Sequence, residues 1–333
     1  MKDLQKELDK RNIFIDKVGI SNFKIPLIVG YDKNTVANIS LSVSLAENKR
    51  AIHMSRLIEV ISSWDKKLSY HQIRKIMNDT KLKLETDNVF LEIQFEYFKD
   101  KISPVSKLVA PISYDCKIIS SLNKDNLIVE LNIPIASVCP CSKEISQFGA
   151  HNQRGIVTIE YKTKELSSID KVISLVEDSS SHELYSLLKR TDEKYITEYG
   201  YNNAKFVEDI IRDITINLYE NGLYDAKIKI KNFESIHSHN AIAELLVNEN
   251  SYMKYKIKKQ IYDELKSRSI DVSNIDDKEL VETHMLSSLS LIQIITNLEE
   301  IVGDLIITDD TDIAKLTTVK NICKYAYNAY ISR

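Results

Sequence analysis

The sequence has little cysteine, no long apolar run and no large excess of charge, and each absence excludes a class of protein. Its 333 residues include only 4 cysteines, too few for a disulfide framework in a chain of this size. No stretch approaches the roughly 18 consecutive apolar residues of a membrane span, and the charged residues 1–12 lack the apolar run of a signal peptide. A net charge of −3 gives no broad basic surface, so neither nucleic acid nor membrane is an expected partner. We expect a cytoplasmic protein.

Hydrophobic residues make up 43% of the chain, enough for a globular protein of two or three folding units. Apolar and polar residues alternate in segments such as 91–97 and 129–133, which predicts strands with one wet face and therefore an antiparallel sheet. Helical spacing in 53–63 and 205–220 predicts helices between the strands. The expected fold class is α+β.

Near residue 250 the alternation stops and helical spacing takes over. One predicted apolar stripe consists of Leu289, Ile292, Ile295, Leu298 and Val302. Residues 271–333 hold 11 acidic and 5 basic side chains. We therefore expect two domains, residues 1–249 and 250–333, the second a small acidic helical bundle.

One loop concentrates reactive side chains. Residues 139–155, CPCSKEISQFGAHNQRG, follow a predicted strand and contain Cys139, Cys141 and His151. Zinc prefers thiolate and imidazole ligands, and a catalytic zinc site needs three or four ligands with one position left for water. Cys139 and His151 are candidates for two of them.

A second segment, ESIHSHNA at 234–241, offers Glu234, His237 and His239. We expect these two histidines to point to opposite faces of the chain, so that only one of them binds metal while the other faces substrate. On the residues alone, a metal site and ordinary hydrogen-bonded histidines both stay open.

Five separated blocks together resemble the type IB GTP cyclohydrolases. They read DKVGISNFKIPLIV at 16–29, IHMSRL at 52–57, LNIPIASVCPCSKEISQFGAHNQRG at 131–155, KFVEDIIRD at 205–213 and ESIHSHNA at 234–241. The resemblance implies metal-dependent hydrolysis of GTP at C8, with formate release and rearrangement to 7,8-dihydroneopterin triphosphate. It also implies tandem tunnelling-fold units, each an antiparallel sheet with a helix pair, in a homotetramer with active sites at subunit interfaces.

Position by position, the resemblance implies a metal held by Cys139, His151, Glu193 and His237. Zinc is the expected ion, with manganese or iron as alternatives because mixed nitrogen, oxygen and sulfur ligands accept several metals. Metal-bound water would then attack C8 of the guanine ring.

The remaining site residues are assigned by role. His239 and Cys141 are candidates for proton transfer beside the metal-binding Cys139. Glu208 is implied to anchor the purine through two parallel hydrogen bonds. Candidate cations for the triphosphate, each of which would otherwise form structural salt bridges, are His53, Arg56, Lys143 and Arg154.

Residues 252–333 resemble an acyl carrier protein. The segments that carry the resemblance are HMLSSLSLIQIITNLEE at 284–300 and TDDTDIAKLTTVKNICKYA at 308–326. The resemblance implies a four-helix bundle with 4′-phosphopantetheine on Ser288, although Ser287 replaces the usual preceding Asp. Implied partners are a phosphopantetheinyl transferase and an acyl- or aminoacyl-loading enzyme. The alternative is an unmodified docking module, for which an acidic surface would serve equally well.

Two other functions stay open for the whole chain. One is a related tunnelling-fold enzyme that acts on another purine or pterin, or that stops at a cyclic phosphate. The other is a noncatalytic metal-binding scaffold that presents the carrier domain. The joint presence of Cys139, His151, His237 and Glu208 favours the cyclohydrolase, because a scaffold needs no purine anchor.

Overall fold

The computed structural model describes residue 5 and residues 7–30, 33–303, 306–307 and 315–332. The chain forms two compact units, Met1–Leu246 and Val247–Arg333. The first unit contains one sheet of eight strands in chain order, and the pairs from β1 to β7 are antiparallel. The predictions of an α+β class and an antiparallel sheet are confirmed.

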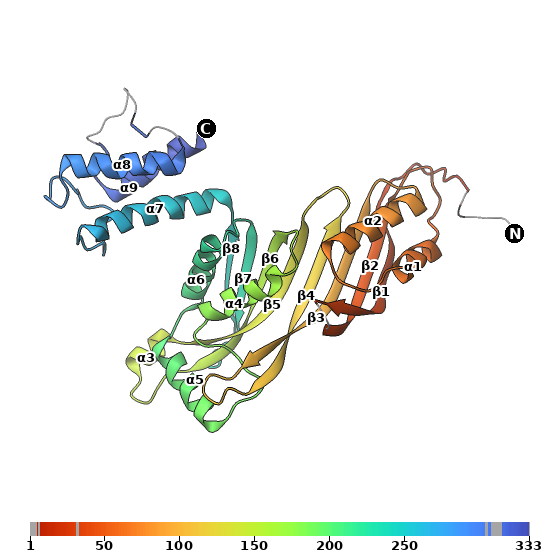
Figure 1. Ribbon diagram of the computed structural model, residues 1–333, viewed down its shortest axis with the longest axis horizontal. Helices are drawn as coiled ribbons and strands as arrows, with labels where there is room; N and C mark the ends of the chain where they lie inside the picture. Colours follow the sequence, from red (N-terminus) through yellow and green to blue (C-terminus); the bar gives the residue numbers. More distant parts are fainter. Residues whose placement is uncertain (1–4, 6, 31–32, 304–305, 308–314, 333) are drawn as a thin grey trace. The chain divides into compact units, whose positions relative to one another are not determined.

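The first unit repeats one order of elements, two strands, helices and two strands (Figure 1). The first round consists of β1 (Ile15–Val29), β2 (Lys33–Leu45), α1 (Met54–Ser62), α2 (Tyr70–Leu84), β3 (Val89–Ile102) and β4 (Val109–Ser121). The second consists of β5 (Leu127–Val138), α3 (Pro140–Ile145), β6 (Asn152–Thr163), α4 (Ser168–Ser179), α5 (Arg190–Asn202), α6 (Val207–Glu220), β7 (Ala226–Asn232) and β8 (Ala241–Val247). The second round thus adds two helices, α3 and α5.

Each round has a helix pair that packs on the sheet. In the first round Leu57 of α1 and Met77 of α2 are fully buried. In the second, Val172 of α4 and Ile210 and Ile214 of α6 are fully buried. Removal of this apolar surface from water is the main stabilising contribution to such a layer.

A buried ionic cluster joins the β3–β4 hairpin of the first round to the second round. Lys101 Nζ lies 2.9 Å from Glu177 Oε1 and 2.6 Å from Glu183 Oε2. The Tyr114 hydroxyl donates to Glu177 at 2.7 Å. Burial, together with the Glu177 carboxylate, raises the pKa of Tyr114 and keeps it a donor. Because an unpaired buried charge is strongly destabilising, this cluster fixes α4 against the hairpin.

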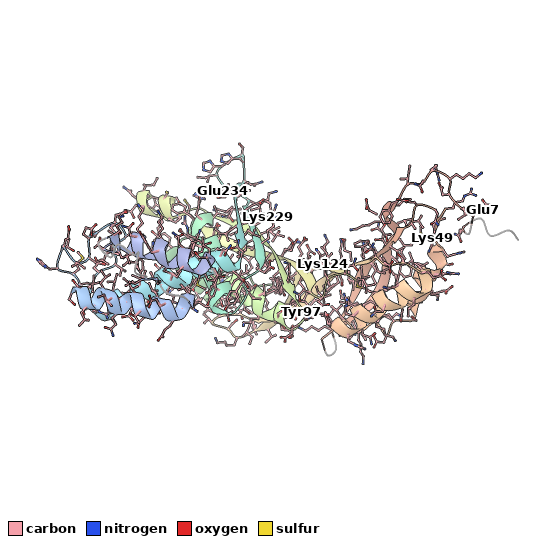
Figure 2. The ribbon with its side chains drawn as sticks, turned by 90° about the horizontal axis from the view of Figure 1, so that it is seen from above. Glu7, Lys49, Tyr97, Lys124, Lys229 and Glu234 are labelled. Atoms are coloured by element: carbon pink, nitrogen blue, oxygen red, sulfur yellow. The ribbon has the colours of Figure 1, made fainter. Side chains whose placement is uncertain are left out.

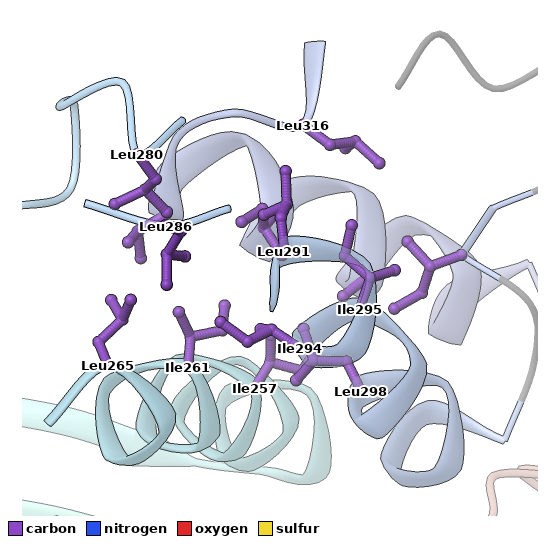
Figure 3. Packing of buried hydrophobic residues seen from close by; sticks show 14 of the residues in the cluster. Ile257, Ile261, Leu265, Leu280, Leu286, Leu291, Ile294, Ile295, Leu298 and Leu316 are labelled. Atoms are coloured by element: carbon purple, nitrogen blue, oxygen red, sulfur yellow. The ribbon is translucent and has the colours of Figure 1, made fainter. Parts of the chain in front are cut away.

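The second unit is helical. Its helices are α7 (Glu249–Ser267), α8 (Ser288–Val302) and α9 (Val319–Ile331). Their apolar faces meet in one core, which includes Ile257 and Ile261 of α7 and Ile294 and Leu298 of α8 (Figure 3). The sequence predicts four helices, and the described residues contain three α-helices. Residues 308–314, which belong to the carrier resemblance, lie outside the described residues. No helix in the described part of the chain is long and apolar enough to span a membrane.

The predicted apolar stripe of α8 is correct in its later turns and wrong in its first. Ile295 and Leu298 are buried, but Leu289 and Ile292 are 77% and 42% exposed. The core phase begins at Leu291 instead, since helical spacing repeats only every three to four residues and an apolar first turn can lie beside the true stripe. Two apolar side chains are therefore left on the surface near Ser288.

Candidate active site

The loop between β5 and β6 is held so that Cys139 and His151 are neighbours. The two strands pair up to Val138 and Asn152, and Cys139 N then donates to His151 O at 3.1 Å. Ser142 Oγ accepts from His151 N at 3.2 Å and donates to Cys139 O at 3.1 Å. Continued strand pairing and the Ser142 side chain thus hold the Cys139 thiol and the His151 imidazole on neighbouring segments.

A hollow of about 280 Å³ gathers side chains from this loop, from the start of α6 and from the segment after β7. The predicted residues that line it are Cys139, His151, Glu208, Glu234, His237 and His239. Further lining residues that the sequence analysis did not single out are Gln153, Lys205 and Asn232. Gln153 stands two positions after His151 in the same block. Residues two apart on a strand lie on the same face, so this spacing predicts that Gln153 lies beside His151.

His237 and His239 both line the hollow, and their rings stack with centroids 5.1 Å apart and an angle of 19° between the ring planes. The prediction that they face opposite sides is wrong. Residues two apart on an extended chain lie on the same face, so this spacing favours a shared side, and residues 235–239 form consecutive bends after β7 ends. The two imidazoles therefore act on the same space.

Glu193 lies in a different hollow, of about 640 Å³, together with Glu198 and His182. Val138 and Asn152 line this second hollow while their neighbours Cys139 and His151 line the first, as alternation along an extended chain requires. Among the described residues, no group of three or more His, Cys, Asp or Glu is arranged to hold a metal ion.

The donor types in the first hollow nevertheless suit zinc. Cys139 supplies a thiol, and His151 and His237 supply imidazoles. These are the ligands that zinc prefers, and a carboxylate can complete such a set. Two carboxylates, Glu208 and Glu234, line the same hollow. The structure thus brings together three of the four predicted ligands by location and leaves Glu193 in the neighbouring hollow.

His53 and Arg56 line a third hollow, of about 420 Å³, beside β2 and α2 in the first round. Glu7 and Lys49 line that same hollow, and Figure 2 shows them at the opposite end of the first unit from Glu234. Arg56 also donates to the Lys83 carbonyl at 3.0 Å. Within one chain, these two predicted cations do not meet the other site residues.

The predicted cations near the loop also lie outside the first hollow. Lys143 Nζ lies 4.8 Å from the centroid of the Tyr201 ring. Arg154 is exposed on β6, where it alternates with the inward Gln153. Cys141 is exposed as well. The cation that does line the hollow is Lys205, which is paired with Asp213 at 2.8 Å.

Glu208 is the second residue of α6, and its carboxylate is not used in capping the helix. The next residue, Asp209, accepts from Phe206 N at 3.0 Å and so closes the helix end. A side chain with hydrogen-bond acceptors at this position interacts favourably with the positive end of the helix dipole. Glu208 is therefore placed as an acceptor that faces the hollow.

Asp192, beside Glu193, fixes the start of α5. Its fully buried carboxylate accepts from Val105 N and Ser106 N at 2.8 Å each, from Ser106 Oγ at 2.6 Å and from Lys189 N at 2.8 Å. Burial disfavours ionisation of Asp192, but these hydrogen bonds outweigh it and hold its pKa below the usual range. The β3–β4 turn and α5 are thereby joined.

We expect Asp192→Asn to destabilise the first unit near neutral pH, because an amide nitrogen would face donors that need an acceptor. A depressed pKa in the folded state stabilises above the ordinary pKa of about 3.9 and is lost as pH falls. The gap in free energy of unfolding between wild type and variant should therefore narrow below about pH 4. Urea titrations across pH measure it.

The matched control is Asp87→Asn, since the Asp87 side chain is 95% exposed. It should leave the free energy of unfolding nearly unchanged. If the difference in free energy of unfolding between wild type and Asp192→Asn stays constant from neutral pH into the acid range, ionised Asp192 does not stabilise the first unit.

Comparison with known proteins identifies relatives of the first unit. Residues 1–243 match the family model of type I GTP cyclohydrolase FolE2. The GTP cyclohydrolase FolE2 of Dictyoglomus turgidum is 45% identical over 249 residues, which cover 73% of this chain and 96% of that protein. The protein of the same name from Desulfosudis oleivorans is 44% identical over 253 residues, covering 74% and 97%.

The family is described as type I, and the finer type IB designation is not part of that description. The family match ends at residue 243, before the second unit begins at Val247. Among solved structures, uricase from Arthrobacter globiformis matches with a TM-score of 0.46 and 6% identity, covering 70% of this chain and 93% of that chain. That likeness is too low to support an argument about function.

Proposed function

The chain belongs, over residues 1–243, to the FolE2 family of type I GTP cyclohydrolases, and on that premise we propose that its first unit hydrolyses GTP at C8. Water adds to C8, the bond from C8 to a ring nitrogen breaks, and hydrolysis of the resulting formamide releases formate. The remaining product rearranges to 7,8-dihydroneopterin triphosphate. The observation that supports this proposal is the single hollow shared by a thiol, three imidazoles and a carboxylate at a helix start.

Cys139, His151, His237 and Glu193 are the proposed metal ligands, with zinc as the ion and manganese or iron as alternatives. When bound, zinc supplies a Lewis acid that lowers the pKa of coordinated water to about 7. The exposed Glu193 side chain would complete the set from the neighbouring hollow.

Glu208 and His239 have separate proposed tasks. The Glu208 carboxylate accepts two parallel hydrogen bonds from the guanine ring N–H and its exocyclic amine. His239 takes a proton from the attacking water and, as an imidazolium, gives it to the departing ring nitrogen, because imidazole can accept and release a proton near pH 7. Cys141 was the other candidate for proton transfer, and its exposed position on α3, outside the hollow, favours His239.

We expect metal-loaded wild-type protein to release formate from GTP and to form a pterin that fluoresces after oxidation. Glu208→Gln should lower kcat/KM about 100-fold, because the amide cannot accept both hydrogen bonds. Metal content should not change. The control is Glu165→Gln, an exposed carboxylate after β6.

No formate from protein shown to hold metal would contradict the proposed function. A pterin cyclic phosphate, or turnover of a different purine, would instead support a related enzyme. Metal binding without any turnover would support the scaffold.

The carboxylate ligand is tested by metal affinity in a competition assay with a chromophoric chelator. Glu193→Gln should weaken binding about 10-fold or more, because a neutral amide is a much poorer ligand. Glu198→Gln is the matched control from the same helix and the same hollow. If Glu198→Gln loses the metal and Glu193→Gln keeps it, the ligand assignment is wrong.

A homotetramer would bring the predicted cations to the substrate. The hollow of about 280 Å³ lies below the roughly 300–1,000 Å³ that is typical of ligand pockets, so GTP would extend beyond it. His53 and Arg56, which line a hollow at the other end of the unit, would bind the triphosphate of another copy's site. A monomer by light scattering at working concentration would contradict this assembly.

For the second unit we propose a carrier function, with 4′-phosphopantetheine on Ser288. Ser288 is the exposed first residue of α8, and Ser287 caps the helix by accepting from Ser290 N at 3.1 Å. The exposed Leu289 and Ile292 give a modifying enzyme an apolar surface beside the hydroxyl. A phosphopantetheinyl transferase and an acyl- or aminoacyl-loading enzyme are the proposed partners.

Modification is tested with coenzyme A and a phosphopantetheinyl transferase of broad specificity. Ser288 Oγ would attack the coenzyme pyrophosphate and release adenosine 3′,5′-bisphosphate, so intact mass should rise by one phosphopantetheine group. Ser288→Ala should abolish the gain, and Ser290→Ala should keep it. A wild-type chain that gains no mass is an unmodified docking module.

A further inference from the structure

A chain of hydrogen bonds runs under the hollow from His151 to β7. His151 Nδ1 lies 2.9 Å from Gln153 Oε1. Gln153 Nε2 donates to Ser137 Oγ at 3.0 Å, and Asn232 Nδ2 donates to the same oxygen at 2.9 Å. Ser137 is fully buried and Asn232 is 2% exposed. The base of the hollow is thus a fixed polar network.

Glu234 fixes which way the Gln153 amide points. Its Oε1 lies 3.4 Å from Gln153 Nε2. A carboxylate can only accept and an amide nitrogen can only donate, so Nε2 must face Glu234 and the amide oxygen must face His151. An acceptor next to Nδ1 places the imidazole proton on Nδ1 of neutral His151.

Close packing of two strands holds the network in place. Gly155 of β6 pairs with Asn232 of β7, and a Cβ at Gly155 would lie 2.3 Å from Asn232 Oδ1. Only glycine leaves room for the amide of Asn232 at this position. Asn232 is thereby directed toward Ser137, which in turn holds Gln153.

We propose that Gln153 is a positioning residue that keeps His151 as its Nδ1–H tautomer, with the lone pair of Nε2 turned to the metal. This inference rests on the proposed function, since it takes His151 as a ligand. Nδ1 is occupied by Gln153 and lies 3.2 Å from Ser235 Oγ, so Nε2 is the ring nitrogen left for coordination. Partners of this kind behind a ligating imidazole change metal affinity about 10- to 100-fold when removed.

The tautomer can be read directly by NMR of metal-free protein labelled with ¹⁵N-histidine, at about pH 8, where an ordinary imidazole is neutral. His151→Gln identifies the resonances by their loss. We expect wild-type His151 to be protonated at Nδ1. Gln153→Leu should shift it toward the Nε2–H form and weaken zinc binding about 10- to 100-fold.

Two further variants complete the test. Gln153→Glu keeps an acceptor beside Nδ1, so it should retain the tautomer and bind zinc more tightly than Gln153→Leu. Gln94→Leu, the same substitution at an exposed position of β3, should change neither the tautomer nor the zinc affinity.

An Nε2–H tautomer in wild-type protein would overturn the assignment, as would an unchanged tautomer and zinc affinity in Gln153→Leu. If Gln153→Leu does not fold, wild type and Gln153→Glu still decide. If metal-free protein shows the expected tautomer and the same protein loaded with metal makes no formate, the proposed function is contradicted and the role of Gln153 stands.

Discussion

Antiparallel pairing of β5 with β6 is the constraint on which the candidate site depends. The register runs from Leu127 opposite Thr163 to Val138 opposite Asn152, and it continues through the Cys139 N–H and the His151 carbonyl. Because side chains alternate across a strand, a slip of one residue would send the Cys139 thiol or the His151 imidazole into the neighbouring hollow. Main-chain pairing therefore determines which hollow the Cys139 thiol and the His151 imidazole enter.

Much of the first unit could be predicted because its signals are local. Alternation at residues 91–97 and helical spacing at 205–220 report burial on one face, and β3 and α6 formed there. Cys139 and His151 stood in one short segment, so their proximity followed from a hairpin. The prediction for His237 and His239 was wrong because residues two apart on an extended chain lie on the same face, and the two rings stack.

Other features depend on contacts between distant segments, and no local pattern encodes those. Glu193 stands outside the five blocks, and its position is determined by how α5 packs beside β5. The role of Asp192 requires the β3–β4 turn, more than 80 positions earlier in the chain. The orientation of the Gln153 amide depends on Ser137 and Glu234, which stand 16 and 81 positions away in the chain.

The two rounds of the first unit differ in the connection within their first pair of strands. β1 ends at Val29 and β2 begins at Lys33, whereas residues 139–151 join β5 to β6 and carry the thiol and the imidazole. A substitution of Cys139 or His151 therefore removes a reactive group without altering any residue of the eight strands.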